Sequence, residues 1–370
     1  MSIQVRRYSE IAALPASCVR LVERCTSLQF DQSLEWYAAL AGHGIGSEQR
    51  VRIYAAFDAA EEAVALLPMR YVARVPWLAE RTLQSLATYY TSLYAPIVAP
   101  QVDPGAALGA VCEALRADRA RWDLLDFAPL DEHSPVTTAL QEQLQRVGFG
   151  VHRYFRFGNW YLPTEQRSFD DYFSSRASQL RNTVTRKGKK LRAHPDVRIE
   201  VATTAEALEP HLAAYQQVYA ASWKVPEPFV EFVPQMVRAL CQRGWLRLGV
   251  VYLGTVPIAA QLWFVKSGAA YIFKLAYDEQ HQSLSAGSVL TATLMAQVMD
   301  VDRVQVVDYL TGDDAYKKDW MTQRRERIGL RVYNHRSVRG ALGALQSFAA
   351  PRLKQLLRRF AARARKPPAT

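Results

Sequence analysis

Residues 285–288, Ser-Ala-Gly-Ser, have the composition of an anion-binding helix start. Residues 269–277 alternate enough to predict a strand, residues 278–284 predict a polar loop, and an apolar helix is predicted from about 289 to 299. Serine is a good N-cap, and glycine lets a ligand approach the backbone closely. A strand that leads into free amides at a helix start suits an anion, although an ordinary capped helix fits the same tetrapeptide.

Cationic side chains cluster upstream of this stretch. A helix is predicted over residues 169–192, and its C-terminal part, residues 181–192, carries six cations: Arg181, Arg186, Lys187, Lys189, Lys190 and Arg192. The formal net charge of the chain is +11. Such clusters favour an anionic partner, such as a nucleotide cofactor, a nucleic acid or an acidic membrane surface. A solvated helix face is the simpler interpretation of the same residues.

The ordered set of motifs resembles a known family. The sequence reads LRNTVTRKGKKL at 180–191, AYDE at 276–279, SAGSVL at 285–290 and DYLTGDDAYKKDW at 308–320. In this order and at this spacing the motifs resemble the CelD/BioF2-like acetyltransferase domain of the GNAT superfamily, which is related to the FemABX transferases. The resemblance covers roughly residues 169–331.

The 370 residues suggest two domains, and the predicted elements repeat along the chain. Each half shows a hairpin, a strand, a helix, a strand, a helix and a strand, which indicates a mixed α/β (α+β) fold with helices on both faces of a sheet. The resemblance implies the same arrangement, two tandem GNAT-like domains, each a mixed sheet flanked by helices. We expect one domain at residues 1–162, a second at 163–336, and a basic helical tail at 337–370.

The resemblance also implies a cofactor site and catalytic residues. The pyrophosphate of acetyl-CoA or another acyl-CoA is expected on the amides of Ala286, Gly287, Ser288 and Val289. Acyl transfer requires a deprotonated nucleophile, a donor to the oxyanion and a proton or cation for the leaving thiolate. Among the catalytic candidates, Asp308 can orient or deprotonate the nucleophile, Tyr316 can protonate the thiolate, and Lys317 can hold a phosphate or developing charge. Asp308 fits a structural role at a strand end equally.

Four residues are candidates for substrate binding: Arg181, Arg186, Lys187 and Trp223. The resemblance places the basic helix near the substrate cleft, where the three cations can contact phosphates. Trp223 ends a predicted helix before Pro226 and can stack on an acceptor or belong to the core.

Several classes of site are absent from the sequence pattern. Cys18, Cys25, Cys112 and Cys241 are scattered and read as buried thiols, and the histidines show no metal-like spacing, so no metal is expected. The first fifteen residues lack the apolar core of a signal peptide, and no run reads as a membrane span. The expected location is the cytoplasm.

The tail at residues 337–370 combines an apolar stripe with a cationic face. It can pack on the second domain, or it can lie on an anionic membrane at the inner face.

The expected function is therefore an acyl-CoA-dependent N- or O-acyltransferase. The family association suggests a small-molecule or lipid-linked sugar acceptor, an envelope or exopolysaccharide precursor. One alternative is a Fem-like transferase that takes its acyl group from aminoacyl-tRNA. The other is a non-catalytic protein that binds nucleic acid or membrane.

Overall fold

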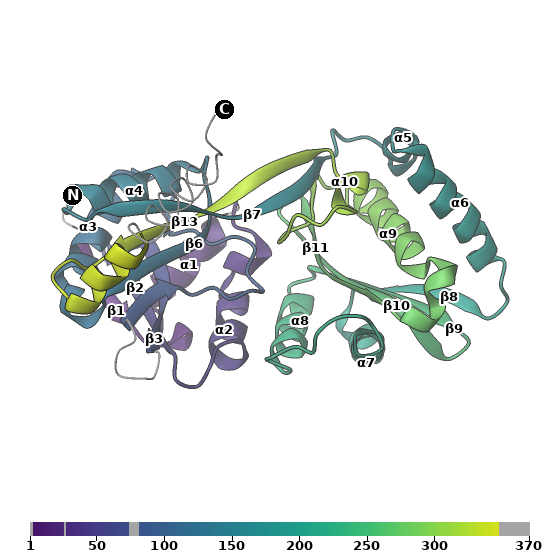
Figure 1. The fold of residues 1–370 in the computed structure, drawn as a ribbon, viewed down its shortest axis with the longest axis horizontal. Coiled ribbons are helices and arrows are strands. Elements are labelled where there is room, and N and C mark those ends of the chain that lie inside the picture. The colour runs from purple at the N-terminus through teal and green to yellow at the C-terminus, as the bar shows by residue number, and fades with distance from the viewer. Residues whose placement is uncertain (1–2, 26, 74–80, 348–370) are drawn as a thin grey trace, which may run out of the picture.

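The computed structural model describes residues 3–25, 27–73 and 81–347, and one mixed sheet of thirteen strands runs through this part of the chain (Figure 1). In spatial order the strands are β1 (Gln4–Tyr8), β2 (Arg50–Phe57), β3 (Ala63–Ala73), β4 (Arg81–Ser85), β6 (Leu124–Asp131), β13 (Gln323–Tyr333), β7 (Val151–Pro163), β12 (Val306–Asp308), β11 (Ala269–Tyr277), β10 (Val256–Lys266), β9 (Leu246–Leu253) and β8 (Val197–Ala202), with β5 (Ile97–Val98) paired to β3 off this row.

The two halves follow the same order of elements. The first runs through β1, two helices, β2, β3, β4, a helix, β6, a helix and β7; the second repeats this order from β8 to β13. The expected mixed α/β fold with tandem halves is thus confirmed, and the two expected sheets are joined into one.

Strands β7 and β13 are exchanged between the halves. The last strand, β13, pairs antiparallel with β6 of the first half, for example Arg331 with Asp126, and also with β7. Strand β7 in turn pairs with β12 of the second half, Val307 opposite Leu162. The expected boundary after residue 162 therefore falls in a strand whose partners both come from the second half of the sequence.

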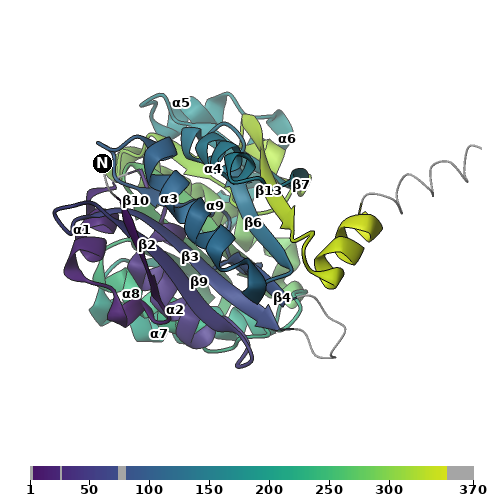
Figure 2. The same cartoon turned by 90° about the vertical axis from the view of Figure 1, so that its left-hand side faces the viewer.

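Helices cover both faces of the sheet (Figures 1 and 2). Helices α3 (Pro104–Ala117) and α4 (Pro135–Arg146) cover the first half, and α5 (Phe169–Ser174), α6 (Ser178–Arg192) and α9 (Ala286–Ala296) cover the second. Between the halves lie α1 (Ala16–Arg24), α2 (Leu34–His43), α7 (Ala205–Ala220) and α8 (Phe232–Gln242), which share one core. The rings of Trp36 and Phe232 meet edge to face there, 5.2 Å apart, and so join α2 to α8.

Helix α9 can lie close to the sheet because of one glycine. Val289, Leu290 and Leu294 of this helix are fully buried, as expected for a helix with apolar residues on most sides. A Cβ atom at Gly249 of β9 would lie 2.8 Å from Leu290 Cδ1 and 3.1 Å from Leu294 Cδ1. Because Gly249 has no side chain, α9 and its first turn can lie close to the sheet.

The tail is described only in part. Residues 338–347 are helical and follow β13 at the margin of the molecule (Figure 2). Ala344 packs against Leu124 and Tyr333. The remainder of the predicted tail, 348–370, lies outside the described residues.

Candidate active site

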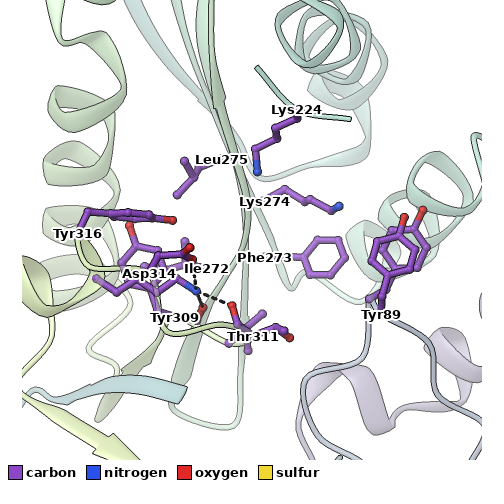
Figure 3. Close-up of a pocket in the computed structure, with 13 residues that line it drawn as sticks. Tyr89, Lys224, Ile272, Phe273, Lys274, Leu275, Tyr309, Thr311, Asp314 and Tyr316 are labelled. Atoms are coloured by element: carbon purple, nitrogen blue, oxygen red, sulfur yellow. Dashed lines mark hydrogen bonds and ion pairs between the residues drawn. The ribbon is translucent and has the colours of Figure 1, made fainter. Parts of the chain in front are cut away.

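A gap opens between β11 and β12 because their pairing is short. The parallel ladder ends at Tyr271 opposite Asp308, whereas β11 continues to Tyr277. A cavity of about 190 Å³, here called the splay cavity, occupies this opening (Figure 3). It is lined by Tyr89, Tyr90, Lys224, residues 272–275, residues 309–311, Asp314, Tyr316 and Lys317.

A β-bulge in β11 shapes the wall of the splay cavity. Leu262 of β10 pairs with Lys274 and the next residue, Trp263, pairs with Ile272, so Phe273 is the extra residue. Bulges change the direction of side chains and often lie beside active sites. Beyond Tyr271 the β11 edge on the β12 side has no strand partner among the described residues. Its backbone groups can therefore bond to a ligand.

Tyr316, which the sequence analysis named as a candidate proton donor, lines the splay cavity. Its ring meets that of Tyr309 edge to face at 5.7 Å, and its side chain remains partly exposed to the splay cavity. Burial, with the Asp314 carboxylate as second cause, raises the pKa of Tyr316 to about 12. The phenol is therefore protonated at neutral pH and can donate a proton.

Lys317 is buried beneath the loop that ends the gap. Its ammonium donates to the carbonyl oxygens of Tyr309 at 3.3 Å, Gly312 at 3.3 Å and also Thr311, and lies 3.4 Å from the Asp314 carboxylate. Burial lowers the pKa of this ammonium. Lys317 thus fixes the loop and adds a positive charge to the cavity wall. Its ammonium group is already hydrogen-bonded to the protein.

Asp308 is buried in a polar network and lines none of the cavities described here. Its Oδ1 accepts from Asn159 Nδ2 at 2.6 Å and from the Leu310 amide at 2.7 Å, and Oδ2 accepts from Arg325. Leu310 has a left-handed backbone, φ 55°, which this carboxylate stabilises. The geometry favours the structural interpretation of Asp308, and Asp314 is the carboxylate that reaches the splay cavity.

The start of α9 has unpaired amides. Ser285 occupies the N-cap position, but its left-handed backbone, φ 54°, leaves its side chain without the capping bond that the sequence suggested. The amides of Ala286, Gly287 and Ser288 find no acceptor within the described chain, and all three residues line a cavity of about 210 Å³, the helix-start cavity. Val289 differs, because its amide donates to the Ser285 carbonyl and its side chain is in the core.

Gln261 is a positioning residue that the sequence analysis missed. Its Nε2 donates to the Gly287 carbonyl and to Thr291 Oγ1, both at 2.8 Å, and its Oε1 accepts from Trp263 Nε1 at 2.9 Å. This buried chain of bonds ties the first turn of α9 to β10. Its only sequence signal is a glutamine within an apolar strand.

Trp223 lines neither cavity, but it lies next to residues that line each of them. Its ring lies 4.5 Å from that of Tyr277, which lines the helix-start cavity, and its neighbour Lys224 lines the splay cavity. The Trp223 side chain is 48% exposed, so it is not a core residue. Its role in binding substrate stays a prediction.

The basic helix α6 reaches this region through Lys187. The Lys187 ammonium donates to the Ser283 carbonyl at 2.6 Å, just before the α9 start, and lines a third cavity together with Lys190 and Leu284. Arg181 and Arg186 are exposed and line none of these three cavities. Of the three predicted cations, the structure brings Lys187 alone to the helix-start region.

One side of the splay cavity comes from the first half of the chain. Glu227 accepts from Tyr90 Oη at 2.7 Å and from the Tyr89 hydroxyl, and forms an ion pair with Lys274. Burial alone would raise the pKa of Glu227, but the Lys274 ammonium and these bonds lower it to about 2. The sequence analysis missed this cluster, because Tyr89 and Tyr90 lie 138 and 137 residues away from Glu227 in the sequence.

The corresponding helix start in the first half is blocked. At α3, Asp103 accepts from the Ala106 amide at 2.8 Å, and Pro104 has no N–H to offer. The fully buried Tyr94 lies against β6, its amide donating to the Pro129 carbonyl at 2.6 Å. An anion is therefore favoured at α9 and disfavoured at α3.

The separating strands β11 and β12 and the uncapped start of α9 lie within the part of the chain that a family model matches. Residues 178–318 match the acetyltransferase (GNAT) domain model. This part of the chain is a GNAT-superfamily domain, which confirms the resemblance drawn from the motifs. No curated protein matches.

Several solved structures share the fold over most of this chain. FemX has a TM-score of 0.63 at 11% identity, covering 92% of this chain and 100% of FemX. The C-terminal domain of a putative lysylphosphatidylglycerol synthetase from Agrobacterium fabrum has a TM-score of 0.55 at 12% identity, covering 90% and 96%. A tandem GNAT protein from the clavulanic acid biosynthesis pathway has a TM-score of 0.52 at 9% identity, covering 90% and 98%. At these identities the likeness establishes the fold alone.

Residues 3–25, 27–73 and 81–347 contain no cluster of three or more His, Cys, Asp or Glu arranged to hold a metal ion. Within the same ranges, every helix is too short or too polar to cross a bilayer.

Proposed function

We propose that this chain transfers an acyl group from acyl-CoA, with acetyl-CoA as the simplest donor, to an amine or hydroxyl. The observation that carries the proposal is the uncapped start of α9, where three free amides face a cavity. Helix starts of this kind bind phosphate groups, because the amide dipoles point at the anion. Lys187 adds a nearby positive charge.

The geometry suggests a path for the donor. With its pyrophosphate on the amides of residues 286–288, acyl-CoA would extend past Tyr277 along the free edge of β11 and bring its thioester to the splay cavity. The acceptor nucleophile attacks the thioester carbon, the C–S bond breaks, and Tyr316 supplies a proton to the leaving thiolate. Backbone N–H groups of β11 can stabilise the oxyanion, and Asp314 can take the proton of the acceptor.

For the acceptor we propose a sugar-linked or lipid-linked envelope or exopolysaccharide precursor. Support comes from the family association of the motifs and from the name of one similar structure, a putative lysylphosphatidylglycerol synthetase, which refers to a lipid product. The likeness to FemX over 92% of the chain keeps the aminoacyl-tRNA donor as the second candidate.

Titration calorimetry with acetyl-CoA tests the donor. We expect Gly287→Val to weaken acetyl-CoA binding at least tenfold, about 1.4 kcal/mol, because the new methyl groups obstruct the approach to the amides. The added Cβ atom does not clash with the protein, since it would lie 3.4 Å from Tyr277 Cδ1, an ordinary van der Waals contact.

The control for this titration is Gly105→Val, at the same second position of α3, where affinity for acetyl-CoA should not change. Unchanged affinity in Gly287→Val would move the cofactor site elsewhere. If charged tRNA binds tightly, with log K falling roughly 0.7–0.9 per phosphate contact for each tenfold rise in salt, and acetyl-CoA does not bind, the aminoacyl-tRNA alternative replaces the proposal.

We further propose that the tail brings the enzyme to an anionic membrane. Val338, Leu342 and Leu345 are exposed, at 77%, 52% and 62%, and their spacing places them on one face of the helix. Leucine and valine on such a face can enter the headgroup boundary, and each nearby cation adds about 1 kcal/mol on an anionic leaflet.

Flotation with anionic vesicles checks the membrane contact. The full chain should float at low salt, and a chain ending after Arg336 should stay at the bottom. Replacing Val338, Leu342 and Leu345 by serine in the full chain should weaken flotation without shortening the chain. Equal flotation of all three proteins would rule out the tail as the anchor.

A further inference from the structure

Three lysine side chains from separate segments line the splay cavity. Lys274 comes from β11 and Lys224 from the segment after α7 (Figure 3). Lys317 is the first residue of the short helix α10 (Lys317–Trp320). Two of these ammonium groups already have carboxylate partners. Lys274 pairs with Glu227, and Lys317 lies 3.4 Å from Asp314 and donates to three carbonyls.

Lys224 is different, because no carboxylate lies within ion-pair distance of it in the described part of the chain. Its ammonium lies 5.6 Å from the Trp223 ring and 6.0 Å from the Tyr219 ring, the distances of weak cation–π contacts. Burial, and next the neighbouring Lys274 ammonium, lower the pKa of the Lys224 ammonium, and the Glu227 and Asp314 carboxylates offset this only in part. A partly buried cation beside two others is costly, and an anion in the cavity would offset that cost.

We propose that Lys224 binds an anionic group of the acceptor, so that the acceptor carries a phosphate or a carboxylate besides the nucleophilic amine or hydroxyl. This inference rests on the proposed acyl transfer and adds the charge of the second substrate to it. The site is separate from the donor phosphate site, since the splay and helix-start cavities share no lining residue. Lys224 is therefore a specificity residue for the acceptor.

Calorimetric titration with three related amines tests the inference without requiring turnover. The probes are glucosamine, which is neutral apart from its amine, glucosamine 6-phosphate, and muramic acid, which carries a carboxylate. We expect the wild-type chain to bind at least one of the two anionic amines at least tenfold more tightly than glucosamine. Lys224→Met should abolish that preference, and Lys224→Arg should keep most of it, because the arginine retains the charge.

Two controls separate this result from binding at other places. Lys318→Met removes an exposed cation that lies next to Lys317 but does not line the cavity, and it should keep the preference. Gly287→Val should also keep the preference. An anion bound at the start of α9 would be lost in that variant, so a retained preference places the anion elsewhere. A phosphate-only or carboxylate-only preference identifies the anionic group.

Three outcomes would overturn the inference: equal affinity for all three amines, no binding of either anionic amine, or the same preference in Lys224→Met as in the wild type. These results are independent of the acetyl-CoA titration. A chain that binds acetyl-CoA but shows no anion preference retains the proposed function and loses this inference.

Discussion

Replacing Tyr316 by phenylalanine is expected to lower kcat roughly 10²-fold while the Kd for acetyl-CoA and the Tm change little. The phenol lines the splay cavity, and its pKa of about 12 keeps the proton available for the leaving thiolate. The ring is retained in the variant, so its contact with Tyr309 at 5.7 Å is preserved. Thiol release from acetyl-CoA, calorimetry and thermal unfolding give the three quantities.

A suitable control is Tyr252→Phe on β9, a tyrosine that lines neither the splay cavity nor the helix-start cavity. Its kcat should be close to that of the wild type. An unchanged kcat in Tyr316→Phe, or a Tm loss large enough to explain the lost activity, would remove Tyr316 from the chemistry.

Replacing Asp308 by alanine is expected to lower the free energy of unfolding by about 3–5 kcal/mol. The carboxylate is buried and is the shared acceptor for Asn159, Arg325 and the Leu310 amide. Removing it leaves the Arg325 charge partly buried without its partner and the left-handed turn at Leu310 without its support. Urea unfolding measures the loss.

The comparison for Asp308 is Glu209→Ala, which removes an exposed ion pair with Arg238. Exposed pairs contribute about 0–1 kcal/mol, so this variant should unfold almost as the wild type does. If Asp308→Ala were as stable as Glu209→Ala yet inactive, Asp308 would be a catalytic residue rather than a structural one.

Local features of the site could be predicted from the sequence, and features made by distant contacts could not. The start of α9 depends on a strand, a polar loop and a Ser-Ala-Gly-Ser segment that are consecutive, so its position followed from pattern alone. The pattern at Asp308 allowed two roles, because nothing near it shows that Asn159 and Arg325 will lie opposite. The structural role of Asp308 follows from its contacts with Asn159 and Arg325, which the folded structure brings to it.

The acceptor side of the site shows the same limit. Tyr89 and Glu227 are 138 residues apart in sequence and meet only because the two halves pack together. No periodicity marks Lys274 as facing a cavity, since the bulge at Phe273 changes the direction of the side chains in β11. The blocked start of α3 was also not foreseen, although Asp103 and Pro104 are recognisable as a strong helix start.

The exchange of β7 and β13 has a consequence for synthesis on the ribosome. Until residue 333 has emerged, β6 has one open edge, because its partner on that side is the final strand. Unpaired strand edges invite wrong pairing with other chains, and contacts between distant residues form slowly. The sheet of the nascent first half therefore remains incomplete until β13, the last strand of the described residues, has been translated. The strand pairing of both halves is therefore completed in the same step, when β13 pairs with β6 and β7.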